Sequence, residues 1–157
     1  MRIGQGIDVH AFAEERPLVL GGVRISERGG LAGHSDADAV LHAIVDAILG
    51  ATGSGDIGQH FPSEDARWKD ADSAVFVAEA RRILAEREAE IENVDVTVIA
   101  QRPKLAPFRD AMQANIAKML DLPAGRVNVK ATTTDHLGFI GRGEGICAMA
   151  VVLVDSP

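Results

Sequence analysis

Apolar residues recur at intervals of three and four after Ser35, which predicts one helix that is buried nearly all round. Ser35 is the expected N-cap, with Asp38 completing a capping box, and Gly50 is expected just after the last turn. The apolar arc of this helix consists of Ala37, Leu41, Ile44, Val45 and Ile48. Asp38, His42 and Asp46 follow its edge as an acid–imidazole–acid stripe. Burying such groups is costly unless they are paired or bind a metal, so we expect the stripe to have a chemical role.

Alternating apolar residues predict strands on both sides of this helix. The first strand places Ile3, Ile7 and Val9 on one face and Asp8 and His10 on the other, because side chains two apart share a face. The predicted strands cover residues 2–10, 18–20, 23–25, 94–100, 127–134 and 146–154. Two further helices are predicted, one from residue 72 or 73 to 87 and one over 107–120, and residues 51–71 read as a long irregular segment.

The alternation of strands and helices predicts an α/β (α+β) fold, a mixed β-sheet with helices packed on one face. At 157 residues the chain is expected to form a single domain, residues 1–157, large enough to bury a core. A net charge of −7 without a basic run argues against a nucleic acid or an anionic membrane as partner. The lone Cys147 allows no intrachain disulfide and, with no signal sequence or membrane-spanning stretch in view, favours the cytoplasm.

Asp8, His10 and His42 are candidate metal ligands if the first strand lies beside the buried helix. One carboxylate and two imidazoles would leave a tetrahedral zinc ion one open position, as in catalytic zinc sites. Asp38 or Asp46, each one helical turn from His42, is expected to orient its free ring nitrogen. The alternative is that the two histidines are unrelated polar residues, and their spacing alone does not decide the question.

Other polar positions have an ordinary explanation beside a functional one. Asp56 lies in a glycine-rich loop that could cradle a polyol or a phosphate, but turn aspartates commonly make local hydrogen bonds. Lys104 and the pair Thr132 and Thr133 follow or end predicted strands, where they could contact phosphate. Solvation of the lysine and the β propensity of threonine explain them without a ligand. Capping alone accounts for Ser35.

Six short motifs occur in order between Arg2 and Val154. They are Gly6-Ile7-Asp8-Val9-His10, Gly33-His34-Ser35-Asp36-Ala37-Asp38, Gly55-Asp56-Ile57-Gly58, Ala100-Gln101-Arg102-Pro103-Lys104, Asn128-Val129-Lys130-Ala131-Thr132-Thr133-Thr134 and Gly141-Arg142-Gly143-Glu144-Gly145. Together they resemble the 2-C-methyl-D-erythritol 2,4-cyclodiphosphate synthase family of the non-mevalonate isoprenoid pathway. Six motifs in one short chain are a specific signal, which favours the metal triad over unrelated polar residues.

The resemblance implies a lyase in which the 2-phosphate of a cytidine-diphosphate-linked methylerythritol attacks the β-phosphorus and CMP leaves. It implies Zn²⁺, or another divalent transition metal, on Asp8, His10 and His42. A second ion, Mg²⁺ or Mn²⁺, would bridge the substrate diphosphate and be held by Asp135. The resemblance further assigns His34 and Thr133 to stabilising the transition state.

The substrate-binding residues that the resemblance implies fall into three groups. The metal ligands' neighbours and the methylerythritol pocket would comprise Asp8, Val9, His10, His34, Ser35, Asp56, Ile57, Gly58, Phe61, Pro62, Ser63, Glu64 and Asp65. The cytidine would bind Ala100, Gln101, Arg102, Pro103, Lys104, Leu105 and Ala106. The phosphates and the region shared between subunits would involve Thr132, Thr133, Thr134, Asp135, Phe139 and Arg142.

The resemblance also implies a homotrimer with its sheets toward the threefold axis and its active sites between subunits. The residue pattern agrees, because one layer of helices covers only one face of a sheet with apolar strands. The chain departs from the family pattern at Ser63, where many members carry aspartate, and at Asp135, where glutamate is usual. Two other functions stay open: a zinc-dependent nucleotide-diphosphate hydrolase, and a non-catalytic trimer that binds isoprenoid diphosphates.

Overall fold

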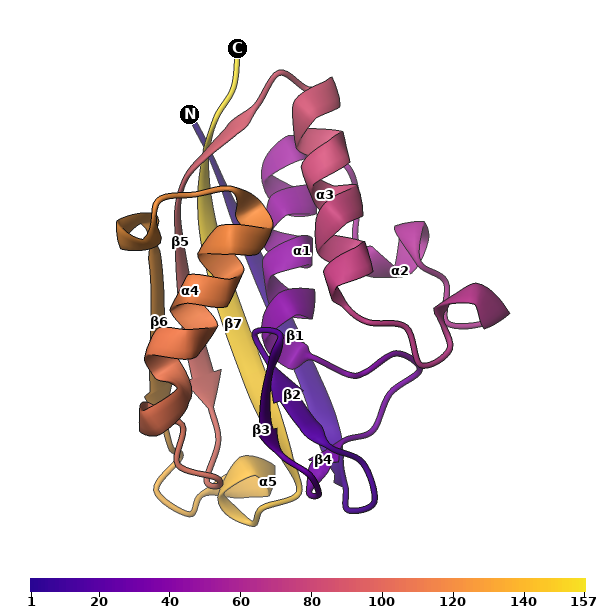
Figure 1. Ribbon diagram of the computed structural model, residues 1–157, viewed down its shortest axis with the longest axis vertical. Helices are drawn as coiled ribbons and strands as arrows, with labels where there is room; N and C mark the ends of the chain where they lie inside the picture. Colours follow the sequence, from indigo (N-terminus) through magenta and orange to yellow (C-terminus); the bar gives the residue numbers. More distant parts are fainter.

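The computed structural model describes residues 1–157, with a five-stranded mixed sheet in the order β4-β1-β7-β5-β6. Strands β5 and β6 are parallel and the other neighbouring strands are antiparallel. Helices α1, α3 and α4 lie on one face of the sheet (Figure 1). The predicted mixed sheet with helices on one face is therefore confirmed. None of the helices is both long and apolar enough to cross a membrane.

The elements follow one another along the chain in nearly the predicted order. The strands are β1 (Arg2–Ala13), β2 (Leu18–Leu20), β3 (Val23–Ser26), β4 (Gly30–Leu31), β5 (Glu90–Ile99), β6 (Val127–Thr132) and β7 (Gly145–Asp155). The α-helices are α1 (Ala39–Thr52), α2 (Ile57–His60), α3 (Ala74–Glu86), α4 (Arg109–Leu120) and α5 (Gly138–Gly141). Short 3-10 turns are η1 (Ala66–Trp68), η2 (Ala106–Phe108) and η3 (Ala124–Arg126). Strands β2 and β3, both predicted, pair antiparallel as a hairpin that forms a separate two-stranded sheet.

The first helix begins and ends later than its sequence suggests. Asp38, not Ser35, is its N-cap, and Gly53, with φ of 66°, ends it in place of Gly50. The Asp38 carboxylate accepts a hydrogen bond from the Leu41 amide at 3.0 Å. It also accepts from the amides of Gly21 and Gly22, at 2.9 and 2.7 Å, and so joins the turn of the β2–β3 hairpin to the start of α1. Contacts from a distant hairpin therefore set this boundary.

Helix α1 lies unusually close to β1, because glycines face it from the strand. A Cβ atom on Gly6 would lie 1.9 Å from the Ala43 carbonyl oxygen, and one on Gly4 would lie 1.7 Å from that of Ala47. No side chain other than hydrogen fits at either position. The two glycines alternate with outward-facing residues, so the next positions on the same face, Asp8 and His10, also face α1.

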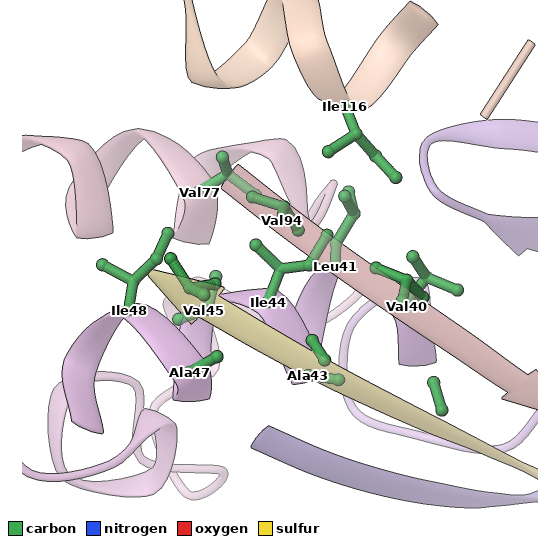
Figure 2. Close-up of a cluster of buried hydrophobic side chains, with 14 of the residues drawn as sticks. Val40, Leu41, Ala43, Ile44, Val45, Ala47, Ile48, Val77, Val94 and Ile116 are labelled. Carbon is green, nitrogen blue, oxygen red and sulfur yellow. The ribbon is translucent and has the colours of Figure 1, made fainter. Parts of the chain in front are cut away.

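The core fills the space between the sheet and its helices. Figure 2 shows α1 side chains clustered with Val77 of α3, Val94 of β5 and Ile116 of α4. The labelled α1 residues in this cluster are Val40, Leu41, Ala43, Ile44, Val45, Ala47 and Ile48, and all are buried. Helix α1 is thus buried nearly all round, as its pattern predicts.

The opposite face of the sheet carries exposed apolar side chains. Ile3, Ile7 and Val9 of β1 are 72%, 52% and 49% exposed, and Val151 of β7 is 42% exposed. The structure confirms that the three β1 residues share one face. No helix of this chain covers it (Figure 1), and an apolar sheet face is ordinarily packed against something.

Candidate metal centre and substrate cleft

Asp8, His10 and His42 converge where β1 passes the first full turn of α1. One possible ligand atom from each residue lies within 4.8 Å of the others. Asp8 Oδ2 is 2.7 Å from His10 Nε2 and 3.3 Å from His42 Nδ1. The two segments that spacing alone could not bring together are therefore neighbours, because Gly4 and Gly6 let the helix approach the strand.

The hydrogen bonds around these residues fit a cation at their centre. His10 Nδ1 lies 2.6 Å from the Ala32 carbonyl oxygen, which can only accept, so this nitrogen carries the ring proton. The lone pair of His10 Nε2 then faces the Asp8 carboxylate. His10 Nε2 and Asp8 Oδ2 are both buried without a hydrogen-bond partner. One carboxylate and two imidazoles with converging lone pairs suit a divalent transition metal and leave room for a further ligand.

The electrostatics of Asp8 and His10 agree with this interpretation. Burial raises the pKa of Asp8, but the two neighbouring imidazoles outweigh burial and bring that pKa to about 2. Burial lowers the pKa of His10, but the Asp8 carboxylate outweighs it and raises the pKa above its usual value. The carboxylate is therefore ionised, and the space between the three residues favours a positive charge.

A cleft of about 450 Å³ opens beside the three residues. Two metal ligands, the loop before α1, the segment around α2 and the start of α3 form its walls. The lining residues are His10, His34, Ser35, His42, Ile57, Gly58, Phe61, Pro62, Ser63, Glu64, Trp68 and Phe76. We call the triad and these residues together the metal cleft. The sequence-predicted residues of the methylerythritol pocket that line it are thereby placed next to the triad.

One wall of the metal cleft is aromatic. The ring centroids of Phe61 and Phe76 are 4.4 Å apart, and Trp68 meets both rings edge-on at 5.2 and 5.8 Å. No sequence motif includes Trp68 or Phe76. The spacing of aromatic residues across an irregular segment gives no periodic signal, so only the folded chain shows that they meet.

Two predicted residues at the edge of the metal cleft make local hydrogen bonds. Asp56 caps α2 by accepting from the Gln59 amide at 2.9 Å. Asp65 caps η1 by accepting from the Arg67 amide at 3.0 Å, and its carbonyl oxygen lies 3.2 Å from His34 Nε2. The ordinary explanation of Asp56 thus describes its contacts within the chain. Arg16, which no motif singled out, donates to the carbonyl oxygens of Gly33 and Ser35 and holds the loop that carries His34.

The expected partners of His42 are wrong. Asp38 is occupied by three backbone amides, and Asp46 accepts from the Ile57 amide at 2.7 Å. His42 Nε2 instead lies 2.8 Å from Ser73 Oγ and 3.2 Å from Ser35 Oγ. The Asp38 carboxylate binds the β2–β3 turn and that of Asp46 binds the start of α2, whereas the ring of His42 extends toward the start of α3.

The remaining predicted residues gather where the parallel strands β5 and β6 end. We call Ala100–Ala106 together with Thr132–Asp135 the strand-end group. The Ala100 amide donates to the Thr132 carbonyl oxygen at 3.0 Å, and the His136 amide donates to Gln101 Oε1 at 3.1 Å. Thr132, Thr133 and Asp135 are exposed, and α5, which carries Phe139, lies at the same end of the sheet (Figure 1).

The strand-end group and the metal cleft are separate within one chain. No residue of the strand-end group lines the metal cleft. Figure 1 shows β6 at one edge of the sheet and α2 beyond α1 at the other side. One chain therefore assembles the metal-binding part of the predicted site but leaves the nucleotide-binding part apart from it.

Comparison with known proteins decides the family. The YgbB family matches residues 1–155. The chain belongs to the YgbB family. It is 57% identical over 153 residues to the 2-C-methyl-D-erythritol 2,4-cyclodiphosphate synthase of Geobacillus kaustophilus (strain HTA426), covering 98% of this chain and 97% of that one. The enzyme of the same name from Bacillus cereus (strain ATCC 10987 / NRS 248) is 54% identical, with the same coverage.

Solved structures of YgbB family relatives have the same fold. The bifunctional IspDF from Campylobacter jejuni superposes with a TM-score of 0.91 at 46% identity, over 99% of this chain and 42% of that longer one. The CDP complex of IspF from Plasmodium falciparum superposes with a TM-score of 0.87 at 39% identity, over 99% and 96%. The family resemblance predicted from the six motifs is thereby confirmed.

Proposed function

We propose that the chain converts 4-diphosphocytidyl-2-C-methyl-D-erythritol 2-phosphate to 2-C-methyl-D-erythritol 2,4-cyclodiphosphate with release of CMP. The observation that carries this proposal is the Asp8, His10 and His42 cluster at the wall of a cleft, in a chain 57% identical to a synthase of that name. The relatives' name alone does not show that this chain has the groups that the reaction needs. The intact cluster supplies the metal ligands for it.

The reaction needs positioning and charge neutralisation rather than a protein nucleophile. An oxygen of the 2-phosphate forms a bond to the β-phosphorus, and the bond from that phosphorus to the bridging oxygen breaks. CMP departs with the electron pair, and the product closes as an eight-membered cyclic diphosphate. Holding both phosphates in line lowers the entropic cost of ring closure, and cations offset their mutual repulsion.

The residues of the metal cleft suit the methylerythritol part of this substrate. Asp8, His10 and His42 would hold Zn²⁺ or another divalent transition metal, which when bound supplies Lewis acidity to the β-phosphate. The aromatic wall of Phe61, Trp68 and Phe76 excludes water from one side. His34 and Ser35 line the cleft, and His34 would stabilise charge on the phosphates.

The strand-end group suits the nucleotide part. The backbone and side chains of Ala100–Ala106 would hold the cytidine, with Lys104 near its phosphates. The hydroxyls of Thr132 and Thr133 would bind phosphate oxygens, and Thr133 would assist at the transition state. Asp135, exposed just after β6, would hold the Mg²⁺ or Mn²⁺ that accompanies the diphosphate.

A homotrimer would join the two parts. Two observations support an assembly: no residue of the strand-end group lines the metal cleft, and apolar side chains such as Ile7 and Val151 are exposed on one face of the sheet. In a closed threefold arrangement the sheets face the axis and each active site lies between neighbouring chains, with Phe139 and Arg142 in the shared region. The buried, unpaired Cys147 is consistent with a cytoplasmic enzyme.

Phosphorus NMR of the products tests the proposed function. The purified protein, supplied with Zn²⁺ and Mg²⁺, should convert the cytidine-linked substrate to one cyclic diphosphate and CMP. Linear phosphate with CMP would instead identify a hydrolase, and an unchanged substrate spectrum would identify a binding protein. His42→Ala, prepared in parallel, controls for contaminating activity.

A further inference from the structure

A line of hydrogen bonds leads from His42 away from the metal cleft. His42 Nε2 lies 2.8 Å from Ser73 Oγ, and the Ser73 hydroxyl in turn contacts Asp36 Oδ1. Ser73 precedes α3 and is fully buried, with none of its surface exposed, although no side-chain bond to its own helix explains its position. The role of a buried hydroxyl between a candidate metal ligand and a carboxylate depends on which group donates each hydrogen bond.

Asp36 decides which groups donate, because every group that contacts its carboxylate is a hydrogen-bond donor. Its Oδ1 accepts from the Asp38 amide at 3.1 Å and from the Ser73 hydroxyl, and its Oδ2 accepts from the Ser73 amide at 3.1 Å. The Ser73 hydroxyl therefore donates its proton to Asp36. Only a lone pair of Ser73 Oγ is left to face His42, so His42 Nε2 must carry the ring proton and donate it.

The proton on Nε2 leaves Nδ1 of His42 as the lone-pair nitrogen. That nitrogen is the one directed toward Asp8 Oδ2, at 3.3 Å, where the metal would lie. The contact with Ser35 Oγ is a weaker constraint on the ring, because it is longer, at 3.2 Å, and Ser35 Oγ also accepts from the Ala37 amide. Ser73 is the shorter and directed partner.

We propose that Ser73 is a positioning residue for the metal site: its hydroxyl, fixed by Asp36, holds His42 with Nε2 protonated and Nδ1 free to bind the ion. The proposal rests on the metal centre of the proposed function and names the residues that prepare one of its ligands. A hydrogen bond to the second ring nitrogen is how proteins orient histidine ligands, and its loss typically costs about 10- to 100-fold in metal affinity.

The same residues join the metal ligand to the segment that lines the metal cleft. The Asp36 amide donates to the Ala71 carbonyl oxygen at 3.0 Å, and the Asp70 amide donates to the His34 carbonyl oxygen at 2.7 Å. The loop that precedes α1 and the loop that precedes α3 are thus paired along their backbones. Ser73 lies where this pairing meets the ring of His42.

Zinc affinity of the full-length protein, measured by competition with a chelator, tests the proposal. Ser73→Ala should bind zinc about 10- to 100-fold more weakly than the unmodified chain. Asp72→Ala is the matched control, because the neighbouring Asp72 is exposed and accepts from the Ala74 amide at 2.9 Å without touching His42. The control should bind zinc as the unmodified chain does.

Proton NMR of the zinc-loaded proteins gives a readout that general loss of stability would not move. The Nε2 proton of His42 should be a downfield signal that exchanges slowly in the unmodified protein and in Asp72→Ala, and exchanges rapidly in Ser73→Ala. Asp36→Asn serves if Ser73→Ala does not fold. Since both Asp36 oxygens accept from backbone amides, the new amide group must oppose a donor, and the same signal should exchange faster.

The outcomes separate the two proposals. An unmodified chain that binds no zinc would overturn the metal centre of the proposed function. Zinc binding by the unmodified chain, with equal affinity and an equally protected His42 proton in Ser73→Ala, would overturn the role of Ser73 alone.

Discussion

The metal cleft and the strand-end group differ in how much of their order comes from one chain. In the metal cleft, Asp8, His10 and His42 lie on elements packed backbone to backbone, and one ring nitrogen of each histidine has a hydrogen-bond partner. In the strand-end group, Thr132, Thr133 and Asp135 are exposed, and the group is tied together by a few backbone and amide contacts. The chain thus pre-forms the part proposed to bind a metal, whereas we expect the part proposed to bind the nucleotide to need substrate or a neighbouring chain to complete it.

The largest effect is expected from removing a metal ligand. His42→Ala should abolish zinc binding and lower turnover by on the order of 10³-fold, because the phosphate charge loses its principal stabiliser. Elemental analysis and a turnover assay measure the two effects. Full zinc content in this variant would show that the ion binds elsewhere.

A smaller loss of turnover, about 100-fold, is expected in the strand-end group from Asp135→Asn, which removes a carboxylate that would hold the second ion. Asparagine suits the left-handed backbone at this position, where φ is 53°, so the melting temperature should stay unchanged. Asp135→Glu, closer to the family pattern, should remain active. Normal turnover in Asp135→Asn would mean that this residue holds no metal.

Disrupting the apolar sheet face should leave zinc binding by the metal cleft intact but lower the turnover that also needs the strand-end group. The double variant Ile3→Glu and Val151→Glu places charges on exposed positions, so one chain should still fold and bind zinc. If the face is an interface, the charges prevent assembly, and turnover should fall at least about 10-fold as the assembly is lost. Light scattering, zinc analysis and turnover decide the case. A fully active monomer would contradict the proposed assembly.

A further effect, on stability, is expected from the glycines of β1 that let α1 approach the strand. Gly6→Ala should lower the free energy of unfolding by about 1–3 kcal/mol, because its Cβ would lie 1.9 Å from the Ala43 carbonyl oxygen. Gly50→Ala is the matched control, since its nearest neighbour would be 3.8 Å away. Urea unfolding at one protein concentration should show the control unchanged or stabilised by up to about 1 kcal/mol.

Local patterns predicted most of the fold and part of the site. Period-two alternation placed Asp8 and His10 on one face of β1, and helical periodicity found the burial of α1. Sequence could not show that Gly4 and Gly6 let these two elements touch, because that depends on a carbonyl oxygen of another segment. The start of α1 was misplaced for a similar reason, since the turn at Gly21 and Gly22 captures the capping carboxylate.

The partners of His42 and the division of the site needed the folded chain. Asp38 and Asp46 were natural candidates at one helical turn, but their carboxylates are satisfied by backbone amides. The sequence marks Ser73 only as a possible start of another helix, which indicates no contact with His42. The motifs likewise predicted one site that contains both the nucleotide-binding residues and the metal ligands. Within one chain, however, no strand-end residue lines the metal cleft.

In the proposed assembly, each active site combines the metal cleft of one chain with the strand-end group of another. Mixing unfolded His42→Ala and Asp135→Asn chains and refolding them together tests it directly, because each inactive chain carries the half that the other lacks. If sites form between chains of a trimer, random mixing at equal amounts should restore about one quarter of normal activity. Activity no higher than that of the two variants refolded separately would show that both halves come from the same chain, and would contradict the account.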